Sequence, residues 1–273
     1  MSNTVLRILS AIVLIALVLL VIWFGRSTAF LLVCLCSLLA IDEVHTKLFK
    51  GKRAAVYFVS QLLFILPACF LFFGPYLFDL NAFFIYLALG VNSILLIYLF
   101  SGSLDSKWIH YFFDRVPFLT SLLIGPSMLS LLILLEADDW RKFLASLLVI
   151  NFSMDTGAWF FGKNFGKHKL WQRISPKKTI EGLIGGMLCS GLLGSVAWYL
   201  FFESFNYWLF VFFLILGALS QVGDLVQSKI KRQCGVKDSS QLIPGHGGVY
   251  DRIDSLVFLT PFYTFVLSSF YLG

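Results

Sequence analysis

The segment YWLFVFFLILGALSQVGDLVQSKIKR, Tyr207 to Arg232, passes from hydrocarbon to dense charge within a single run. Its first part, residues 207–227, carries only one charged side chain, that of Asp224. A helix needs about 20 apolar residues to cross a bilayer. The segment therefore predicts a membrane-spanning helix that ends at a charged membrane surface.

The composition of the whole chain supports the same interpretation. Of the 273 residues, 59% are hydrophobic and 13% are charged, whereas soluble domains carry about 25% charged residues. To bury so many hydrophobic residues, a soluble protein of this length would need a larger core than its surface-to-volume ratio allows. The sequence predicts an all-α, polytopic integral membrane protein and excludes an ordinary soluble domain.

We expect about nine transmembrane helices. They cover residues 6–24, 27–44, 55–73, 82–100, 116–135, 143–162, 180–201, 207–227 and 253–271. The second is the weakest, because Asp42 and Glu43 lie near its end. The first apolar run, Leu6 to Phe24, is too long for the core of a cleaved signal peptide, so we expect it to remain as a helix.

The basic residues predict the orientation of the chain. If the N-terminal tail and the loops after every second span face one side, all but three of the 21 Lys and Arg residues lie there. The exceptions are Arg26, Arg141 and Lys142. Because cytoplasmic loops carry an excess of Lys and Arg, we expect a cytoplasmic N-terminus and an external C-terminus.

The chain divides by composition into two regions. Residues 1–142 have the short loops of a transmembrane helical scaffold. Residues 143–273 hold an acid inside a span and both long basic loops, so we expect them to form the catalytic region. The five cysteines show no metal-ligand spacing and are expected to serve packing.

Four carboxylates stand out from this apolar background. Asp155 lies inside the sixth span, where an acid costs about 2.5–3.5 kcal/mol on insertion scales, so we expect it to line a polar cavity. Asp224 lies one and two helical turns from Ser228 and Lys231, which places the three side chains on one face. Asp251 and Asp254 share a face at the start of the ninth span. The alternative is that these acids cap helices and pair with Arg232, Arg252 or other cations.

Three of these acids suit a metal site. Asp224, Asp251 and Asp254 converge on one membrane boundary, and carboxylate oxygens are the ligands that Mg²⁺ prefers. Lys177 and Lys178 stand at the start of the seventh span, where free N–H groups favour an anion. A site that mixes cations with carboxylates suits a phosphate–metal complex better than a lipid-binding patch, which needs no acids.

Two short stretches combine glycine with charged residues or histidine. GKNFGKHK, residues 162–169, lacks the glycine spacing and the hydroxyl residue of a P-loop. Pro244-Gly245-His246-Gly247-Gly248 predicts a turn that permits close backbone approach to a ligand. His246 either contacts phosphate, acts as an acid or hydrogen-bonds within the turn. Gly182 and Gly186, four residues apart, indicate close helix packing.

Together these motifs resemble one known family. The pattern consists of Ser228-Lys229-x-Lys231-Arg232, Lys237-Asp238-Ser239, Pro244-Gly245-His246-Gly247-Gly248 and Asp251-Arg252-x-Asp254. In this unbroken order it resembles the phosphatidate cytidylyltransferase (CDP-diacylglycerol synthase) family. Ser175-Pro176-Lys177-Lys178-Thr179 and the Asp155 segment resemble it too, and the likeness is clearest over residues 143–271.

The resemblance implies a nucleotidyltransferase that converts CTP and phosphatidic acid into CDP-diacylglycerol and pyrophosphate. It also implies Mg²⁺, with a second, monovalent cation as a further candidate, and a homodimer in a bacterial-type inner membrane with its site facing the cytoplasm. No nucleic-acid partner is expected. The chemistry is mainly charge neutralisation, since the lipid phosphate is already an anion at neutral pH.

The expected roles follow from this chemistry. Asp224, Asp251 and Asp254 would hold metal, and Lys231, Arg232, Lys237 and Arg252 would neutralise phosphates as catalytic residues. The expected substrate-binding residues are Lys177, Lys178, Ser228, His246 and Asp155. The alternatives are a CTP-dependent lipid kinase of the polyprenol or phytol type, a prenyltransferase, an ion-coupled transporter built around Asp155, and a lipid-binding scaffold. A prenyltransferase should carry two aspartate-rich motifs, and only Asp251-x-x-Asp254 is present.

Overall fold

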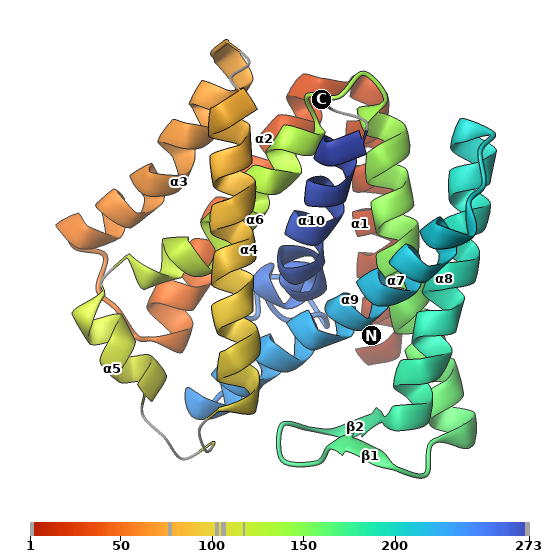
Figure 1. Cartoon of the computed structure of the whole chain (residues 1–273). Helices are drawn as coiled ribbons and strands as arrows, with labels where there is room; N and C mark the ends of the chain where they lie inside the picture. The colour runs from red at the N-terminus through yellow and green to blue at the C-terminus, as the bar shows by residue number, and fades with distance from the viewer. Residues whose placement is uncertain (1–2, 76–77, 102–103, 105–107, 117, 271–273) are drawn as a thin grey trace.

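The computed structural model describes residues 3–75, 78–101, 104, 108–116 and 118–270 (Figure 1). Most of the described chain is helical, and its two strands form one short hairpin. Its N-terminal half contains α1 (Asn3–Phe24), α2 (Arg26–Glu43), the π-helical turn η1 (Val44–Leu48), α3 (Ala55–Phe73), α4 (Phe78–Phe100), α5 (Trp108–Arg115) and α6 (Leu119–Leu134). Its C-terminal half contains α7 (Trp140–Phe165), β1 (Lys169–Trp171), β2 (Ser175–Thr179), α8 (Ile180–Phe202), α9 (Tyr207–Gln233) and α10 (Tyr250–Phe270).

Each of the nine expected spans overlaps a helix of the structure. Within the described residues, six helices are long and apolar enough to cross a membrane: α2 continued by η1, α3, α4, α7, α8 and α9. Within the same described residues, Leu9–Phe24 of α1 and Leu119–Leu134 of α6 are shorter apolar helical segments. The helical fold and its membrane-like character are therefore confirmed, while the number of nine crossings stays a prediction.

The core centres on α6 and α10, which neighbouring helices surround (Figure 1). From Thr120 to Leu134 nearly every residue of α6 is buried. The hydroxyl of Thr264 in α10 donates to the carbonyl of Ser130 in α6 at 3.2 Å. These inner helices hold the two halves of the chain together.

Glycines let α7 and α8 approach closely. A Cβ added to Gly186 would lie 2.7 Å from the carbonyl oxygen of Met154, and one added to Gly182 would lie 2.8 Å from that of Ala158. No side chain fits at either position without moving a backbone. The expected packing role of Gly182 and Gly186 is confirmed, as small residues allow such approach in membranes.

The hairpin between α7 and α8 was not predicted. Its strands are antiparallel, with Lys169 opposite Thr179 and Trp171 opposite Ser175. Thr179 then caps α8, since its hydroxyl accepts a hydrogen bond from the amide of Gly182 at 3.1 Å. The hairpin places Lys177 and Lys178 beside the first turn of α8, at one end of the molecule (Figure 1).

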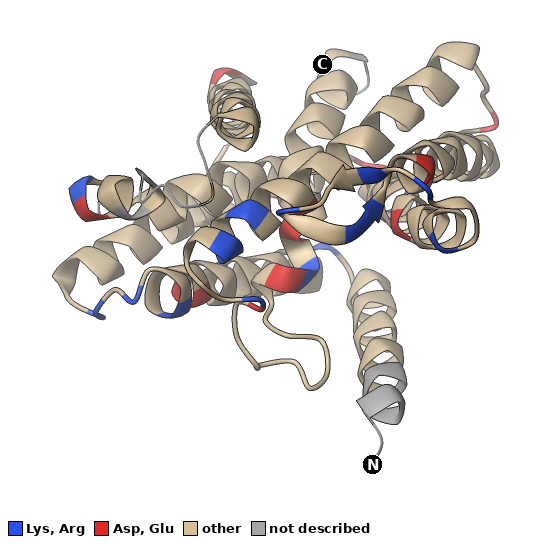
Figure 2. Cartoon of the chain, turned by 90° about the horizontal axis from the view of Figure 1, so that it is seen from below, with Lys and Arg blue, Asp and Glu red and all other residues tan. Residues whose placement is uncertain are grey.

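That end of the molecule gathers much of the charge. Seen from below, several Lys and Arg residues come to the front with acids among them, while long stretches of the helices carry no charge (Figure 2). α9 runs obliquely toward the foot of α4 and delivers its charged last turns there (Figure 1). The candidate site is built at this end.

Candidate active site

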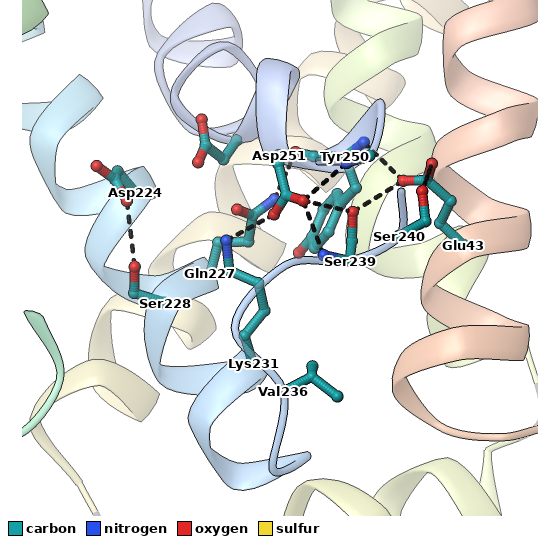
Figure 3. A network of polar contacts seen from close by, with 12 residues as sticks. Glu43, Asp224, Gln227, Ser228, Lys231, Val236, Ser239, Ser240, Tyr250 and Asp251 are labelled. Carbon is teal, nitrogen blue, oxygen red and sulfur yellow. Dashed lines mark hydrogen bonds and ion pairs between the residues drawn. The ribbon is translucent and has the colours of Figure 1, made fainter. Parts of the chain in front are cut away.

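Lys231 and Asp251 form the centre of the polar network in Figure 3. The Lys231 Nζ lies 2.7 Å from Asp251 Oδ1, and the two side chains are only 10% and 4% exposed. Lys231 belongs to the last turns of α9 and Asp251 to the first turn of α10. The ion pair therefore closes the loop of residues 234–249 between these helices.

The second oxygen of Asp251 organises the same loop. Asp251 Oδ2 accepts hydrogen bonds from the Ser239 amide at 2.7 Å, the Ser239 hydroxyl at 2.9 Å and the Gly248 amide at 2.9 Å. Three donors use the acceptor capacity of this oxygen. Asp251 was predicted as a metal ligand, but its carboxylate is largely committed to the protein's own donors.

Glu43 is a residue of this network that sequence reasoning missed. It ends α2, is 4% exposed, and accepts hydrogen bonds from Ser239, Ser240, Val249 and Tyr250 (Figure 3). A signal was available, because an acid at the end of an apolar span needs partners. The sequence marks Glu43 and Asp42 as acids near the end of the second span, but it predicts no partner for either.

The glycines of the turn make room for these carboxylates. A Cβ on Gly248 would lie 2.1 Å from Ser239 Oγ and 2.3 Å from Glu43 Oε2. Gly247 has φ +85°, and a Cβ there would lie 2.6 Å from Asp251 Oδ2. The expected close approach is therefore present, but the groups that approach are side chains of the protein itself.

His246 belongs to the same turn and contacts α1. Its Nδ1 lies 2.7 Å from the hydroxyl of Ser10, and that hydroxyl also donates to the carbonyl of Pro244 at 3.1 Å. The His246 amide donates to the carbonyl of Ile243 at 3.0 Å. The structure thus supports the turn-forming alternative for His246, and a substrate contact stays a prediction.

A second group of charges lies beside the first. Asp224 pairs with Lys178 of the hairpin, with Nζ and Oδ2 2.5 Å apart. It also accepts a hydrogen bond from Ser228 at 3.2 Å (Figure 3). Asp155, exposed on α7, interacts electrostatically with Asp224, Lys178 and Arg252. The structure therefore brings α7, α9 and the hairpin together at this point.

Asp254 joins this second group. Its carboxyl interacts electrostatically with Asp224, Lys231 and Asp155. Oxygen donors of this kind suit a hard cation such as Mg²⁺. Among the residues that the structure describes, however, no three acidic, His or Cys side chains are close enough to form a metal site as they stand. The Lys178 ammonium occupies the position beside Asp224 that a cation would take.

The Lys and Arg side chains that we predict to bind phosphate differ in their exposure. Arg232, Lys237, Arg252 and Lys177 are exposed and so accessible to phosphate, whereas Lys231 is buried against Asp251. Lys229, which lies in the same motif, is 2% exposed. Its ammonium donates to the carbonyls of Tyr98, Leu99 and Ser101 at 2.6, 3.2 and 2.5 Å, and so caps the C-terminus of α4.

Cys234 follows α9 within the charged loop. Burial raises the pKa of its thiol to about 11, with the nearby Lys50 opposing the shift. The thiol is therefore protonated at neutral pH, and a protonated thiol is a poor nucleophile. This agrees with the absence of any catalytic pattern around Cys234 in the sequence.

Comparison with known proteins identifies relatives of this chain. The model of the "Cytidylyltransferase family" matches residues 5–270. The phosphatidate cytidylyltransferase of Staphylococcus haemolyticus (strain JCSC1435) is 47% identical over 135 residues, which is 48% of this chain and 51% of the relative. That of Staphylococcus aureus (strain COL) is 50% identical over 114 residues, which is 41% of this chain and 44% of the relative. The chain spans about half the length of the curated relatives it matches.

Proposed function

Because the chain belongs to the cytidylyltransferase family, we propose that it converts CTP and phosphatidic acid into CDP-diacylglycerol and pyrophosphate. The observation that carries the proposal is the assembly of α9, the loop 234–249 and α10 into one charged site. The matched relatives bear the name of this activity. The site also offers both signs of charge, which a nucleotide polyphosphate and its metal require.

In the proposed reaction, an oxygen of the lipid phosphate attacks the α-phosphorus of CTP. A new phosphorus–oxygen bond joins lipid and nucleotide, the bond between the α-phosphorus and the bridging oxygen breaks, and pyrophosphate leaves. Because both reactants are anions, the reaction depends on positioning and on neutralising their charge. No strong general base is needed, since the lipid phosphate is already ionised near neutral pH.

The exposed cations would receive the phosphates. Lys237 lies within the loop that Lys231 and Asp251 close, Arg232 and Arg252 lie just outside its two ends, and Lys177 lies on the hairpin beside Lys178. When a metal ion binds Asp224, the Lys178 ammonium would leave Asp224 and pair with a substrate phosphate instead. Asp155 and Ser228 lie beside this position and would contact the bound complex.

The cofactor we propose is Mg²⁺, with a monovalent cation as a second candidate. Asp224 and Asp254, with Asp155 beside them, supply oxygen donors of the right type. Asp251 would contribute at most through Oδ1, because Oδ2 already accepts from the amides of Ser239 and Gly248, and the Ser239 hydroxyl lies 2.9 Å from it as well. A bound divalent ion would neutralise charge on the triphosphate.

We also propose the finer topology and assembly. Nine helices cross a bacterial-type inner membrane, with the N-terminus and the site in the cytoplasm, and residues 143–273 form the catalytic region on the scaffold 1–142. If an impermeant thiol reagent outside intact cells labelled a cysteine placed in the β1–β2 hairpin, this orientation would be wrong. Light scattering of the purified protein tests the proposed homodimer.

The activity is tested by following both products with purified protein, CTP, Mg²⁺ and phosphatidic acid. The proposal predicts equal amounts of pyrophosphate and lipid-linked CMP, and neither product without phosphatidic acid. Release of CDP with a phosphorylated lipid would indicate a lipid kinase instead. If several lipid acceptors gave no nucleotide-dependent product, a transporter or a scaffold would become the better account.

A further inference from the structure

We propose that Glu43 is a positioning residue, which sets the place of the phosphate-binding cations although it touches no substrate itself. This inference rests on the proposed function. Glu43 ends α2, within residues 1–142, which we propose form the scaffold. It would connect that scaffold to the loop 234–249, which contains Lys237 and precedes Arg252 by three residues.

The contacts of Glu43 reach both ends of the loop. Oε1 accepts from the Ser240 hydroxyl at 2.7 Å and from the Val249 amide at 3.0 Å. Oε2 accepts from the Ser239 hydroxyl at 2.9 Å and from the Tyr250 amide at 3.0 Å. One carboxylate therefore fastens the start of the loop to its end, and both to α2.

The positions of these contacts connect Glu43 with the predicted phosphate ligands. Ser239 follows Lys237 by two residues, and Tyr250 precedes Arg252 by two. Both cations are exposed, so the backbone beside them decides where their charges lie. A shift of the loop base would move both cations relative to the acids Asp224 and Asp254.

The charge of Glu43 is balanced by hydrogen bonds alone. Its side chain forms no ion pair within the part of the chain that the structure describes. Two of its donors, the amides of Val249 and Tyr250, belong to the start of α10, where N–H groups lack helical partners and the helix dipole favours an anion. The geometry therefore needs a carboxylate with four accepting positions.

Ser239 links Glu43 to the Lys231–Asp251 pair. Its hydroxyl lies 2.9 Å from both Glu43 Oε2 and Asp251 Oδ2, and one hydroxyl proton can serve only one of them at a time. Gly248 leaves the space in which these oxygens meet. Glu43 thus belongs to the same network as the ion pair that closes the loop.

Glu43→Gln tests the carboxylate with almost no change of shape. Whichever way the amide turns, its NH₂ group faces one backbone amide, Val249 or Tyr250, and cannot accept from it. We expect kcat/KM for CTP to fall about 100-fold, the size of effect that a displacement of about 1 Å can produce. The half-saturating Mg²⁺ concentration should rise at the same time, because Lys237 and Arg252 would be displaced relative to the acids that bind the metal.

The neighbouring acid provides a matched control. Asp42 pairs with Arg53 at 2.8 Å and accepts from Tyr57 at 2.7 Å, outside the loop network. Asp42→Asn should keep kcat/KM within about threefold of the unmodified protein, since exposed ion pairs contribute little. Glu43→Asp retains the charge and should recover part of the lost activity. If Glu43→Gln fails to fold, Ser240→Ala removes one donor to Glu43, together with the acceptor of the Leu242 amide, and should raise the KM for CTP to a smaller extent.

Two readouts separate this inference from a purely structural role and from the activity itself. A structural role predicts a less stable protein whose folded fraction keeps the normal KM for CTP and Mg²⁺ dependence, and that result would overturn the inference. Hydrogen exchange of full-length protein should show faster exchange over residues 238–252 in Glu43→Gln but not in Asp42→Asn. Unchanged exchange refutes the positioning role, whereas an inactive unmodified protein refutes only the proposed function.

Discussion

Gly248→Ala tests whether the two carboxylates meet as the structure describes. The added methyl group would lie 2.1 Å from Ser239 Oγ and 2.3 Å from Glu43 Oε2. Both oxygens would have to retreat by more than about 1 Å to reach van der Waals distance. The Ser239 hydroxyl would then lose its contacts with Glu43 and Asp251, which are both 2.9 Å long.

The magnitude follows from these contacts. Hydrogen bonds to charged groups contribute about 1.5–3 kcal/mol each, and overpacking costs about 1–3 kcal/mol. Since one hydroxyl proton serves only one carboxylate at a time, we count one such bond and expect a loss of about 2.5–6 kcal/mol in the free energy of unfolding. For a chain of this size that corresponds to a fall in Tm of at least about 5 °C.

The assay is thermal unfolding of the purified protein in detergent, followed by size-exclusion chromatography. Gly90→Ala is the matched control, because a Cβ at Gly90 in α4 meets nothing within 4 Å and alanine favours a helix. Gly90→Ala should keep the Tm or raise it slightly. If Gly248→Ala also kept both the Tm and the activity of the unmodified protein, the described carboxylate network would be wrong.

Two further predictions concern the metal and the loop thiol. Asp224→Asn should raise the half-saturating Mg²⁺ concentration of the reaction at least about tenfold. Lys178→Met, which removes the ammonium beside Asp224, should not raise it. Equal Mg²⁺ dependence in Asp224→Asn and the unmodified protein would exclude Asp224 as a ligand. In a variant with Cys234 as the sole cysteine, maleimide labelling should be slow at pH 7 and accelerate up to the pKa of about 11, because burial disfavours the thiolate. Labelling that is already fast at pH 7 would show an accessible, ionised thiol.

The helices were predictable because they are long apolar runs with few charges. Each expected span overlaps a helix, and Gly182 and Gly186 pack α8 against α7 as their spacing indicated. The hairpin and α5 were not predicted, because strands of three and five residues and a helix of eight carry little periodicity. Their form depends on the helices that they join.

The residue types of the site were predictable, but their partners were not. Lys229 and Lys231 are two residues apart in one basic motif, yet one caps α4 and the other pairs with Asp251. Asp251 and Asp254 share a helical face, but the folded loop gives them different partners. The amides of Ser239 and Gly248 donate hydrogen bonds to Asp251 and not to Asp254. Glu43 lies 196 to 207 residues from its partners, a separation that no local pattern reveals.

The most direct test of the central claim uses CTP labelled separately at the α- and γ-phosphates, with phosphatidic acid and Mg²⁺. Gly248→Ala, prepared in the same way, controls for a contaminating enzyme. The account predicts that α-label enters the lipid, that γ-label leaves as pyrophosphate, and that Gly248→Ala reduces both. Entry of γ-label into the lipid, or equal transfer by both proteins, would contradict it.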